Sequence, residues 1–290
     1  MDRKVRHGHL RPMRKTLTCL GLLMALALPA AAHCDLSPDA RPAAAARYVP
    51  LATLCVNELP DNARILREME TEFLEMVNAA RAAEGLTELG LRAELLLPAR
   101  FHSLDMAANG FFDHVGPDAR SAPDRIALLD RSLLSRSQAE NLALAAGDWE
   151  PAGMAQRLHQ GLMDSSSHRR NILDPRWTDM AIGIVRVGDR VAVTQLFVAR
   201  GGEIFPPPPP EVMAGDRVSF NILLHDWTPE EAVWRDGRGG ERSTRLGLAG
   251  TSAPEDAPGE AVLLVRAMRP GEKPGQRWFL NFSGPAITVR

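Results

Sequence analysis

Between residues 61 and 163, apolar residues recur every three or four positions in several stretches, which is the spacing of one face of an α-helix. The pattern predicts helices at residues 61–85, 92–109, 122–129 and 149–163. Asp61 or Asn62 is expected to cap the first helix, and Gly85 is expected to end it. Residues 33–60 are rich in Ala, Pro and Arg and have no clear period, so we assign them to a mature N-terminal segment.

Runs that are typical of β-strands follow the predicted helices. Met180–Val187 and Arg190–Val198 flank Gly188-Asp189, a pair that favours the two-residue turn of a β-hairpin. Beyond residue 210, short alternating runs are separated by turns rich in Gly, Pro and Asp. These runs are Arg217–Leu224, Ala232–Trp234, Ala261–Ala267, Arg277–Phe282 and Ala286–Val289. They predict a small all-β module of the sandwich kind.

Five consecutive prolines, Pro206–Pro210, separate the two patterns. A run of this kind favours a stiff polyproline II spacer, so we place a domain boundary there. The predicted organisation is a signal peptide at 1–32, a mature N-terminal segment at 33–60, a first domain at 61–202, a linker at 203–210 and a β-rich module at 211–290.

The N-terminus has the pattern of a secretory signal. Basic residues precede the apolar run Leu17–Leu28, which is too short to span a bilayer, and Ala30–Ala32 supplies small residues for cleavage after Ala32. Met1 and Met13 are both possible starts. The pattern predicts a secreted or periplasmic protein without a transmembrane anchor after cleavage, and an uncleaved anchor is the alternative.

The cysteine count agrees with export. Cys19 lies in the predicted signal, which leaves Cys34 and Cys55 as an even pair in the mature chain. We expect a disulfide between them that contributes about 3 kcal/mol, and two free thiols are the alternative. No third cysteine remains for a zinc site built on Cys. The net charge of -2 offers no basic field to nucleic acid or to an anionic membrane.

Three stretches contain side chains suited to chemistry. Ser165–Pro175 combines an imidazole, two guanidinium groups and an amide, a mixture that an ordinary loop rarely needs. Phe111–His114 and Ala139–Ala143 supply a second imidazole and a carboxylate. The two histidines and the glutamate lie far apart in the sequence, so they form no local motif of the His-Glu-x-x-His type. Only the fold can bring them together.

Residues 61–200, about half of the chain, resemble the CAP superfamily of cysteine-rich secretory, antigen 5 and pathogenesis-related proteins, also called the SCP domain, in its bacterial form. The motifs that match in family order are His102–Ala107, Phe111–His114, Arg120–Ile126, Glu140–Ala143, Ser165–Leu173, Gly183–Ile184 and Thr194–Phe197. The resemblance implies an α-β-α sandwich for this segment. Together with the small all-β, sandwich-like C-terminal domain that the strand pattern predicts, the expected fold class is α+β.

The family fold has a cleft that commonly contains two histidines and two acidic residues. By this resemblance His114 and His168 match the histidines, and Glu140 matches one acid. Ser165 lies nearest to the position of the second acid, and Ala139 replaces the glycine that usually precedes the glutamate. The predicted cleft residues are therefore His114, Glu140, His168, Ser165, Asn171 and His102.

Three functions remain open. We favour a protein that binds a ligand or partner outside the cytoplasm, such as a lipid, a peptide or an envelope component, without catalysis. The alternative is a metal-dependent hydrolase or peptidase in which His114 and His168 bind Zn²⁺ and Glu140 is a ligand or a general base. The third is a scaffold without a small ligand. The missing second acid favours binding or scaffolding over hydrolysis.

Overall fold

The structure is a computed structural model that describes residues 34–37, 44–147, 153–247 and 249–290. All of these residues belong to one compact unit that spans residues 33–290. The predicted signal peptide lies outside the described residues. So does Trp149, at which the fourth helix is expected to begin.

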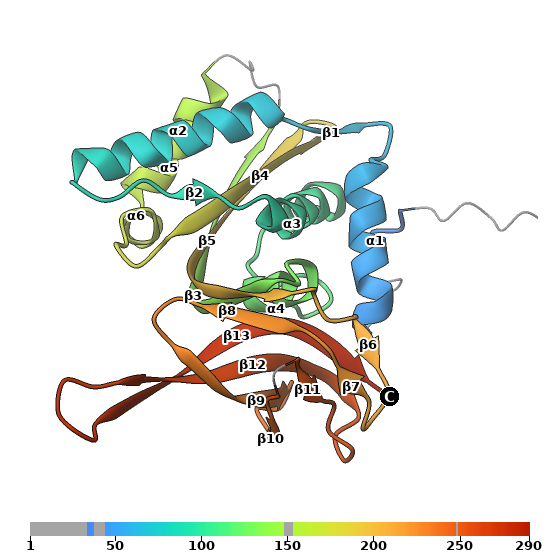
Figure 1. Ribbon diagram of the computed structural model, residues 1–290. Helices are drawn as coiled ribbons and strands as arrows, with labels where there is room; N and C mark the ends of the chain where they lie inside the picture. Colours follow the sequence, from blue (N-terminus) through green and yellow to red (C-terminus); the bar gives the residue numbers. More distant parts are fainter. Residues whose placement is uncertain (1–33, 38–43, 148–152, 248) are drawn as a thin grey trace, which may run out of the picture. The chain divides into compact units, whose positions relative to one another are not determined.

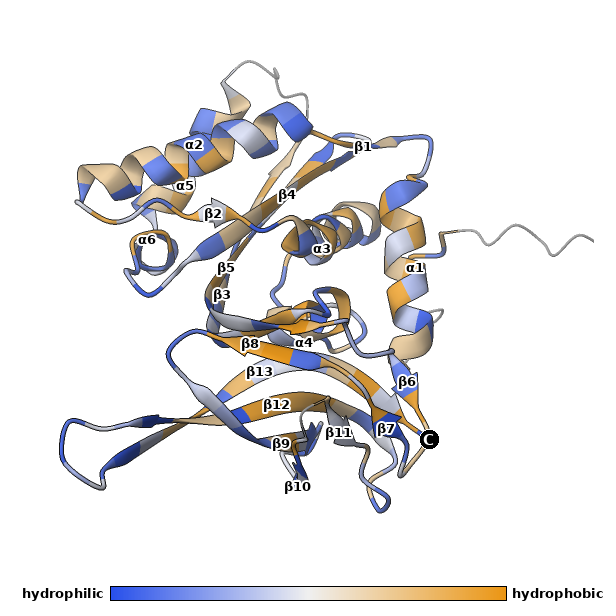
Figure 2. Cartoon of the chain, viewed as in Figure 1, coloured by the Kyte–Doolittle hydropathy of each residue, from blue (hydrophilic) through white to orange (hydrophobic). Residues whose placement is uncertain are grey.

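A sheet of 11 strands runs through the described structure (Figure 1). Its first part contains β1 (Ala63–Ile65), β4 (Asp179–Val187), β5 (Arg190–Phe205) and β3 (Leu133–Ala146) in that order, with β2 (Gly90–Leu91) parallel to β4. β4 and β5 form the predicted hairpin, with Val187 opposite Arg190 across the Gly188-Asp189 turn. Figure 2 shows how hydrophobic these strands are where helices cover them.

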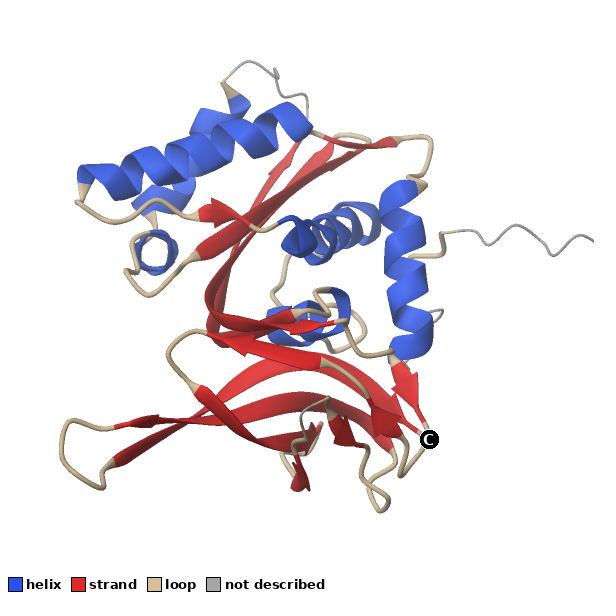
Figure 3. Ribbon diagram, viewed as in Figure 1, coloured by secondary structure: helices blue, strands red, loops and turns tan. Residues whose placement is uncertain are grey.

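Helices cover both faces of these strands (Figure 3). On one face lie α2 (Arg67–Ala83), α5 (Met154–Asp164) and α6 (Ser166–Ile172). Phe73 and Leu162 from these helices share a core with Ile182 and Val193 of the sheet. The other face is covered by η2 (Ala93–Leu95), α3 (Leu96–Asn109) and α4 (Ala122–Leu129). Among the described helices, none has both the length and the apolar character needed to cross a membrane.

A second core lies on the other face of the sheet, because successive side chains along a strand point to opposite faces. Ala181 points away from its neighbour Ile182 and joins Leu196 and Val198 of β5 on the opposite face. There they meet Leu95 and Ala99 at the start of α3. The two cores on opposite faces of one sheet confirm the predicted α-β-α arrangement.

The first predicted helix begins later than expected. Residues 63–65 form β1, in which Ile65 pairs with Val185 of β4, and α2 begins only at Arg67. Strand pairing at the sheet edge satisfies the backbone here, so Asp61 and Asn62 are not caps. Gly85 follows the end of α2 as predicted, with φ at 71°. Ser165 lies between two helices, at the end of α5 and the start of α6.

The mature N-terminal segment contains a helix that the sequence pattern did not predict. α1 (Ala45–Asn57) includes Pro50 and packs on α3 and α4. Its buried side chains have helical spacing: Ala45, Tyr48, Ala52, Cys55 and Val56. The predicted disulfide is confirmed, and it joins Cys34 to Cys55 in the last turn of α1.

The C-terminal strands form an all-β region, as predicted. They are β6 (Glu211–Val212), β7 (Arg217–Val218), β8 (Asn221–Leu224), β9 (Thr228–Asp236), β10 (Glu241–Arg245), β11 (Thr251–Ser252), β12 (Gly259–Pro270) and β13 (Arg277–Val289). Trp234, Val265 and Phe282 lie in their core. β13 pairs with β3 at Ser283 and Ser135, so the sheet continues from the first part of the chain into this region.

Hydrogen bonds hold the proline run against the rest of the fold. The peptide bond between Phe205 and Pro206 is cis. Arg131 donates hydrogen bonds to the carbonyl oxygens of Pro208 at 2.9 Å and Pro209 at 3.1 Å. The run is therefore held against the body of the protein, where a stiff spacer was expected. The domain boundary at these residues stays a prediction.

Candidate functional site

The fold brings the two predicted histidines and the glutamate together. His114 lies in the loop after α3, Glu140 in the middle of β3 and His168 in α6. Nδ1 of His114 lies 2.8 Å from Oε1 of Glu140, within hydrogen-bonding distance. His168 is near enough to His114 for the two imidazoles to influence each other electrostatically. We refer to His114, Glu140 and His168 as the histidine site.

Both carboxylate oxygens of Glu140 take part in hydrogen bonds. Its side chain is 3% exposed, and its Oε2 accepts a hydrogen bond of 2.7 Å from Arg125 of α4. Arg125 also donates to the carbonyl oxygen of Arg120 at 2.6 Å and to that of His114 at 3.2 Å. This buried guanidinium therefore fixes both the carboxylate and the loop that positions His114.

The surroundings move the pKa values of the two histidines in opposite directions. The hydrogen bond to Glu140 raises the pKa of His114, whose side chain is 56% exposed. Burial, and then repulsion from His114, lowers the pKa of His168. Opposite shifts in neighbouring groups favour a state in which His114 is charged and His168 is neutral.

An amide network holds α6 against the sheet next to the site. Asn171 donates to the side-chain oxygen of Asn141 at 2.9 Å, and Asn141 donates to the backbone oxygen of His168 at 3.1 Å. Asn141 also bonds to Gln195 of β5 at 3.1 Å. These bonds position His168 through its backbone and leave its imidazole available.

Two other predicted residues lie beside the site. His102 is 1% exposed, and its Nε2 donates to the backbone oxygen of Asp113 at 3.0 Å, so it supports the loop next to His114. Ser165 lies at the junction of α5 and α6, where its hydroxyl is 3.2 Å from that of Ser167. Neither residue shows a hydrogen bond to Glu140 within the described part of the chain.

The histidine site offers fewer free metal ligands than a catalytic zinc site needs. A catalytic zinc ion usually has three protein ligands. Glu140 already accepts a hydrogen bond at each oxygen, from His114 and from Arg125, and the other donors at the site are the two imidazoles. Across the described residues, no group of three or more His, Cys, Asp or Glu side chains is arranged to hold a metal ion. Zinc binding stays a prediction, and this geometry does not favour it.

Sequence reasoning missed the role of Arg125. One signal was present, because an arginine on the apolar side of a short helix needs a buried partner. α4 begins with a capping box formed by Ser121 and Asp124, which places Arg125 on the face turned toward β3. The partner itself, Glu140, became evident only from the fold.

Comparison with known proteins identifies the segment that contains this site. Residues 74–198 match the model of the CAP, or cysteine-rich secretory protein, family. The chain is 31% identical over 131 residues to uncharacterized protein YkwD of Bacillus subtilis, which covers 45% of this chain and 47% of that protein. It is 30% identical over 138 residues to the uncharacterized membrane protein YlbC of the same species, covering 47% and 36%. The chain thus spans less than half the length of these relatives.

Solved structures show related matches. An extracellular SCP-domain protein from Bacillus anthracis is 26% identical, with a TM-score of 0.38, covering 46% of this chain and 40% of that one. A cysteine-rich secretory protein from Staphylococcus aureus is 19% identical, with a TM-score of 0.36 and coverage of 49% and 40%. An outer surface protein of Borrelia burgdorferi is 16% identical, with a TM-score of 0.40 and coverage of 48% and 98%.

The family match includes the loop of His114, the strand of Glu140 and the helix of His168. It agrees with the order of the motifs read from the sequence. Residues 74–198 of this chain, which contain the histidine site, thus match the cysteine-rich secretory protein (CAP) family.

Proposed function

We propose that this protein acts outside the cytoplasm and that its histidine site binds a ligand or partner without catalysis. The observation that supports this most is the state of Glu140. Both of its oxygens are engaged, one by His114 and the other by Arg125. A general base must have an oxygen within reach of the proton that it removes. A carboxylate held in this way orients the imidazole of His114 and stabilises its protonated form. It is poorly placed to accept a proton from a substrate.

The groups around His114 indicate the chemistry of the ligand. Phe112 is 51% exposed and Val115 is 44% exposed, so the loop that contains His114 also presents apolar side chains to solvent. The raised pKa of His114 favours its charged form, which donates hydrogen bonds. A ligand with an apolar part and a hydrogen-bond acceptor or an anionic group fits this surface. Peptides, lipids and cell-envelope fragments all meet that description.

Two observations support a location outside the cytoplasm. The sequence predicts a signal peptide at residues 1–32. The disulfide between Cys34 and Cys55 is of the kind that persists in oxidising compartments. We expect a secreted or periplasmic protein whose mature chain begins at His33. Mass spectrometry of the protein from the extracellular or periplasmic fraction tests this directly, and an intact chain in the cytoplasm would contradict it.

The binding function is tested by NMR. The imidazole resonances of His114 and His168 are followed while tri-alanine, lysophosphatidylglycerol and muramyl dipeptide are added separately. These probes represent a peptide, a lipid and an envelope fragment. We expect at least one probe to shift these resonances saturably and to bind about tenfold more weakly to His114→Ala. His225→Ala is the control, because His225 is exposed and lies in the C-terminal region. Failure of all three probes to bind would contradict the proposal.

The metal-dependent hydrolase makes a different prediction. Protein purified without a chelator or a histidine tag would contain about one zinc ion per chain, and His168→Ala would lose it. Our proposal predicts no stoichiometric zinc in either protein. If zinc is present and is lost in the variant, binding without catalysis is no longer the favoured function, and a screen for hydrolysis should follow.

A further inference from the structure

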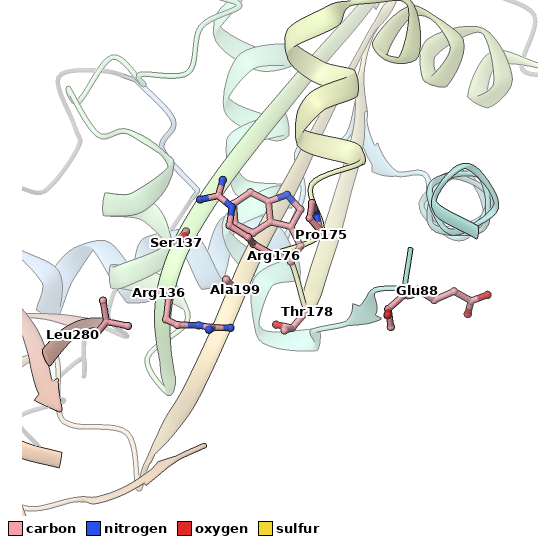
Figure 4. Close-up of a pocket in the computed structure, with 10 residues that line it drawn as sticks. Glu88, Arg136, Ser137, Pro175, Arg176, Thr178, Ala199 and Leu280 are labelled. Carbon is pink, nitrogen blue, oxygen red and sulfur yellow. The ribbon is translucent and has the colours of Figure 1, made fainter. Parts of the chain in front are cut away.

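A cavity lies where the CAP segment meets the C-terminal strands. Its volume is about 610 Å³, which is in the range of small-molecule sites. The walls come from the loop after α2, from β3 and β5, from the segment before β4 and from β13. The lining residues are Thr87, Glu88, Arg136, Ser137, Pro175, Arg176, Trp177, Thr178, Ala199 and Leu280 (Figure 4).

This cavity is separate from the histidine site. None of its lining residues is His114, Glu140 or His168. Leu280 of β13 lies outside the segment that matches the CAP family. The C-terminal strands therefore contribute one side chain, Leu280, to the wall of this cavity.

Arg136 supplies a cation to the cavity. In the pairing of β3 with β5, Ser135 lies opposite Arg200 and Ser137 lies opposite Ala199, so Arg136 is the extra residue of a β-bulge. Bulges redirect side chains and are common next to functional sites. Figure 4 shows the Arg136 guanidinium extending from β3 toward Thr178.

The charge of Arg136 is not neutralised within the described part of the chain, where no carboxylate forms an ion pair with it. The other arginine of the cavity, Arg176, is paired with Asp174 at 2.6 Å. Glu88 is the acidic residue of the lining, and its side chain points away from Arg136 (Figure 4). A guanidinium in this situation is a ready partner for a carboxylate or a phosphate, which it binds through two parallel hydrogen bonds.

The wall beside Arg136 is apolar and rigid. Trp177 is 5% exposed, and its indole N–H donates to the backbone oxygen of Asn171 at 2.7 Å. Its ring stacks on Phe197 with a centroid distance of 6.3 Å. Pro175, Ala199 and Leu280 complete the apolar lining. Such a surface accepts a hydrocarbon body.

We propose that this cavity binds a small amphipathic anion. Arg136 holds the acidic head group, a carboxylate or a phosphate monoester, and the apolar side chains of Pro175 and Leu280 hold the hydrocarbon part. The site is additional to the histidine site and does not depend on its function.

Isothermal titration calorimetry with defined probes tests this proposal. Sodium octanoate and octyl phosphate share the chain and differ in the head group, and octyl glucoside is the neutral control. We expect one or both anions to bind with 1:1 stoichiometry and octyl glucoside to bind much more weakly. Either anion supports the proposal, and the tighter one identifies the head group. Butanoate should bind at least about tenfold more weakly than octanoate, because four methylene groups leave the apolar wall.

Matched variants locate the binding site. Arg136→Gln removes the charge but breaks no ion pair of the described structure, so it should fold normally and bind octanoate at least about tenfold more weakly. Arg217→Gln, at an exposed position in β7, should bind like the parent. His114→Ala should also bind octanoate normally, which separates this proposal from the function of the histidine site. Absence of anion binding, or equal binding by Arg136→Gln and Arg217→Gln, would overturn the proposal.

Discussion

Arg125→Met should destabilise the protein by about 3–5 kcal/mol, the usual cost of removing one partner from a buried ion pair. The side chains of Arg125 and Glu140 are each 3% exposed, so water cannot replace the missing guanidinium. The variant also leaves the backbone oxygens of Arg120 and His114 without their hydrogen bonds from Arg125. Each buried acceptor that loses its partner adds to the cost.

Urea unfolding followed by circular dichroism measures this effect. With a slope of about 3 kcal/mol per molar urea, the midpoint should fall by at least about 1 M. Arg235→Met is the matched control. The ion pair of Arg235 with Glu241 has the same 2.7 Å separation, but the side chains are 45% and 35% exposed. Loss of such a surface pair should cost less than about 1 kcal/mol.

A double variant separates charge from packing. Arg125→Met combined with Glu140→Leu leaves no buried charge, so it should recover a large part of the stability that the single variant loses. If Arg125→Met costs less than about 1 kcal/mol, the pair does not hold the site together. If the double variant is as unstable as the single one, the loss comes from packing, and the electrostatic explanation is refuted.

Three further predictions concern other parts of the fold. Cys34→Ser with Cys55→Ser should lower the free energy of unfolding by about 3 kcal/mol, which urea unfolding measures, and an unchanged midpoint would contradict it. Gly183→Ala should cost at least about 2 kcal/mol, because its Cβ would lie 2.3 Å from a backbone nitrogen of α3. Gly161→Ala, in open space on α5, should not lower the melting temperature, and equal melting temperatures would sink this explanation. His159 has its pKa lowered by burial, so stability should fall as the pH drops through its unfolded value of about 6.5 and on through the lower folded value. His159→Gln should flatten that part of the pH profile, and an unaltered profile would show that other groups cause it.

The sequence was most informative where local chemistry decides the structure. β-branched runs around Gly188-Asp189 predicted the β4–β5 hairpin, because the turn and the strands favour the same pairing. Gly85 was predicted to end the first helix, and it follows α2 with φ at 71°, a conformation that most other residues avoid. The family motifs pointed to His114, Glu140 and His168; the fold brings His114 into contact with Glu140, and the role of the three residues as a site stays a prediction.

The remaining features depend on contacts between distant segments. α1 was missed because Pro50 and the alanine-rich composition obscure its period, and its stability comes from packing on α3 and α4. The role of Arg125 depends on Glu140, in another element. The cavity beside Arg136 requires Leu280, on a strand that the sequence pattern assigns to a different module.

One hydrogen bond described by the structure joins segments that are made far apart in time. The backbone N–H of Ala45, the first residue of α1, donates to the hydroxyl of Thr288 in β13 at 3.1 Å, across 243 positions. A ribosome therefore releases α1 long before the strand against which it closes. Contacts of such high sequence separation slow folding. Until β13 has been synthesised, α1 lacks both this hydrogen bond and the strand on which its first turn packs, so the N-terminal helix completes its contacts only when the chain is nearly finished.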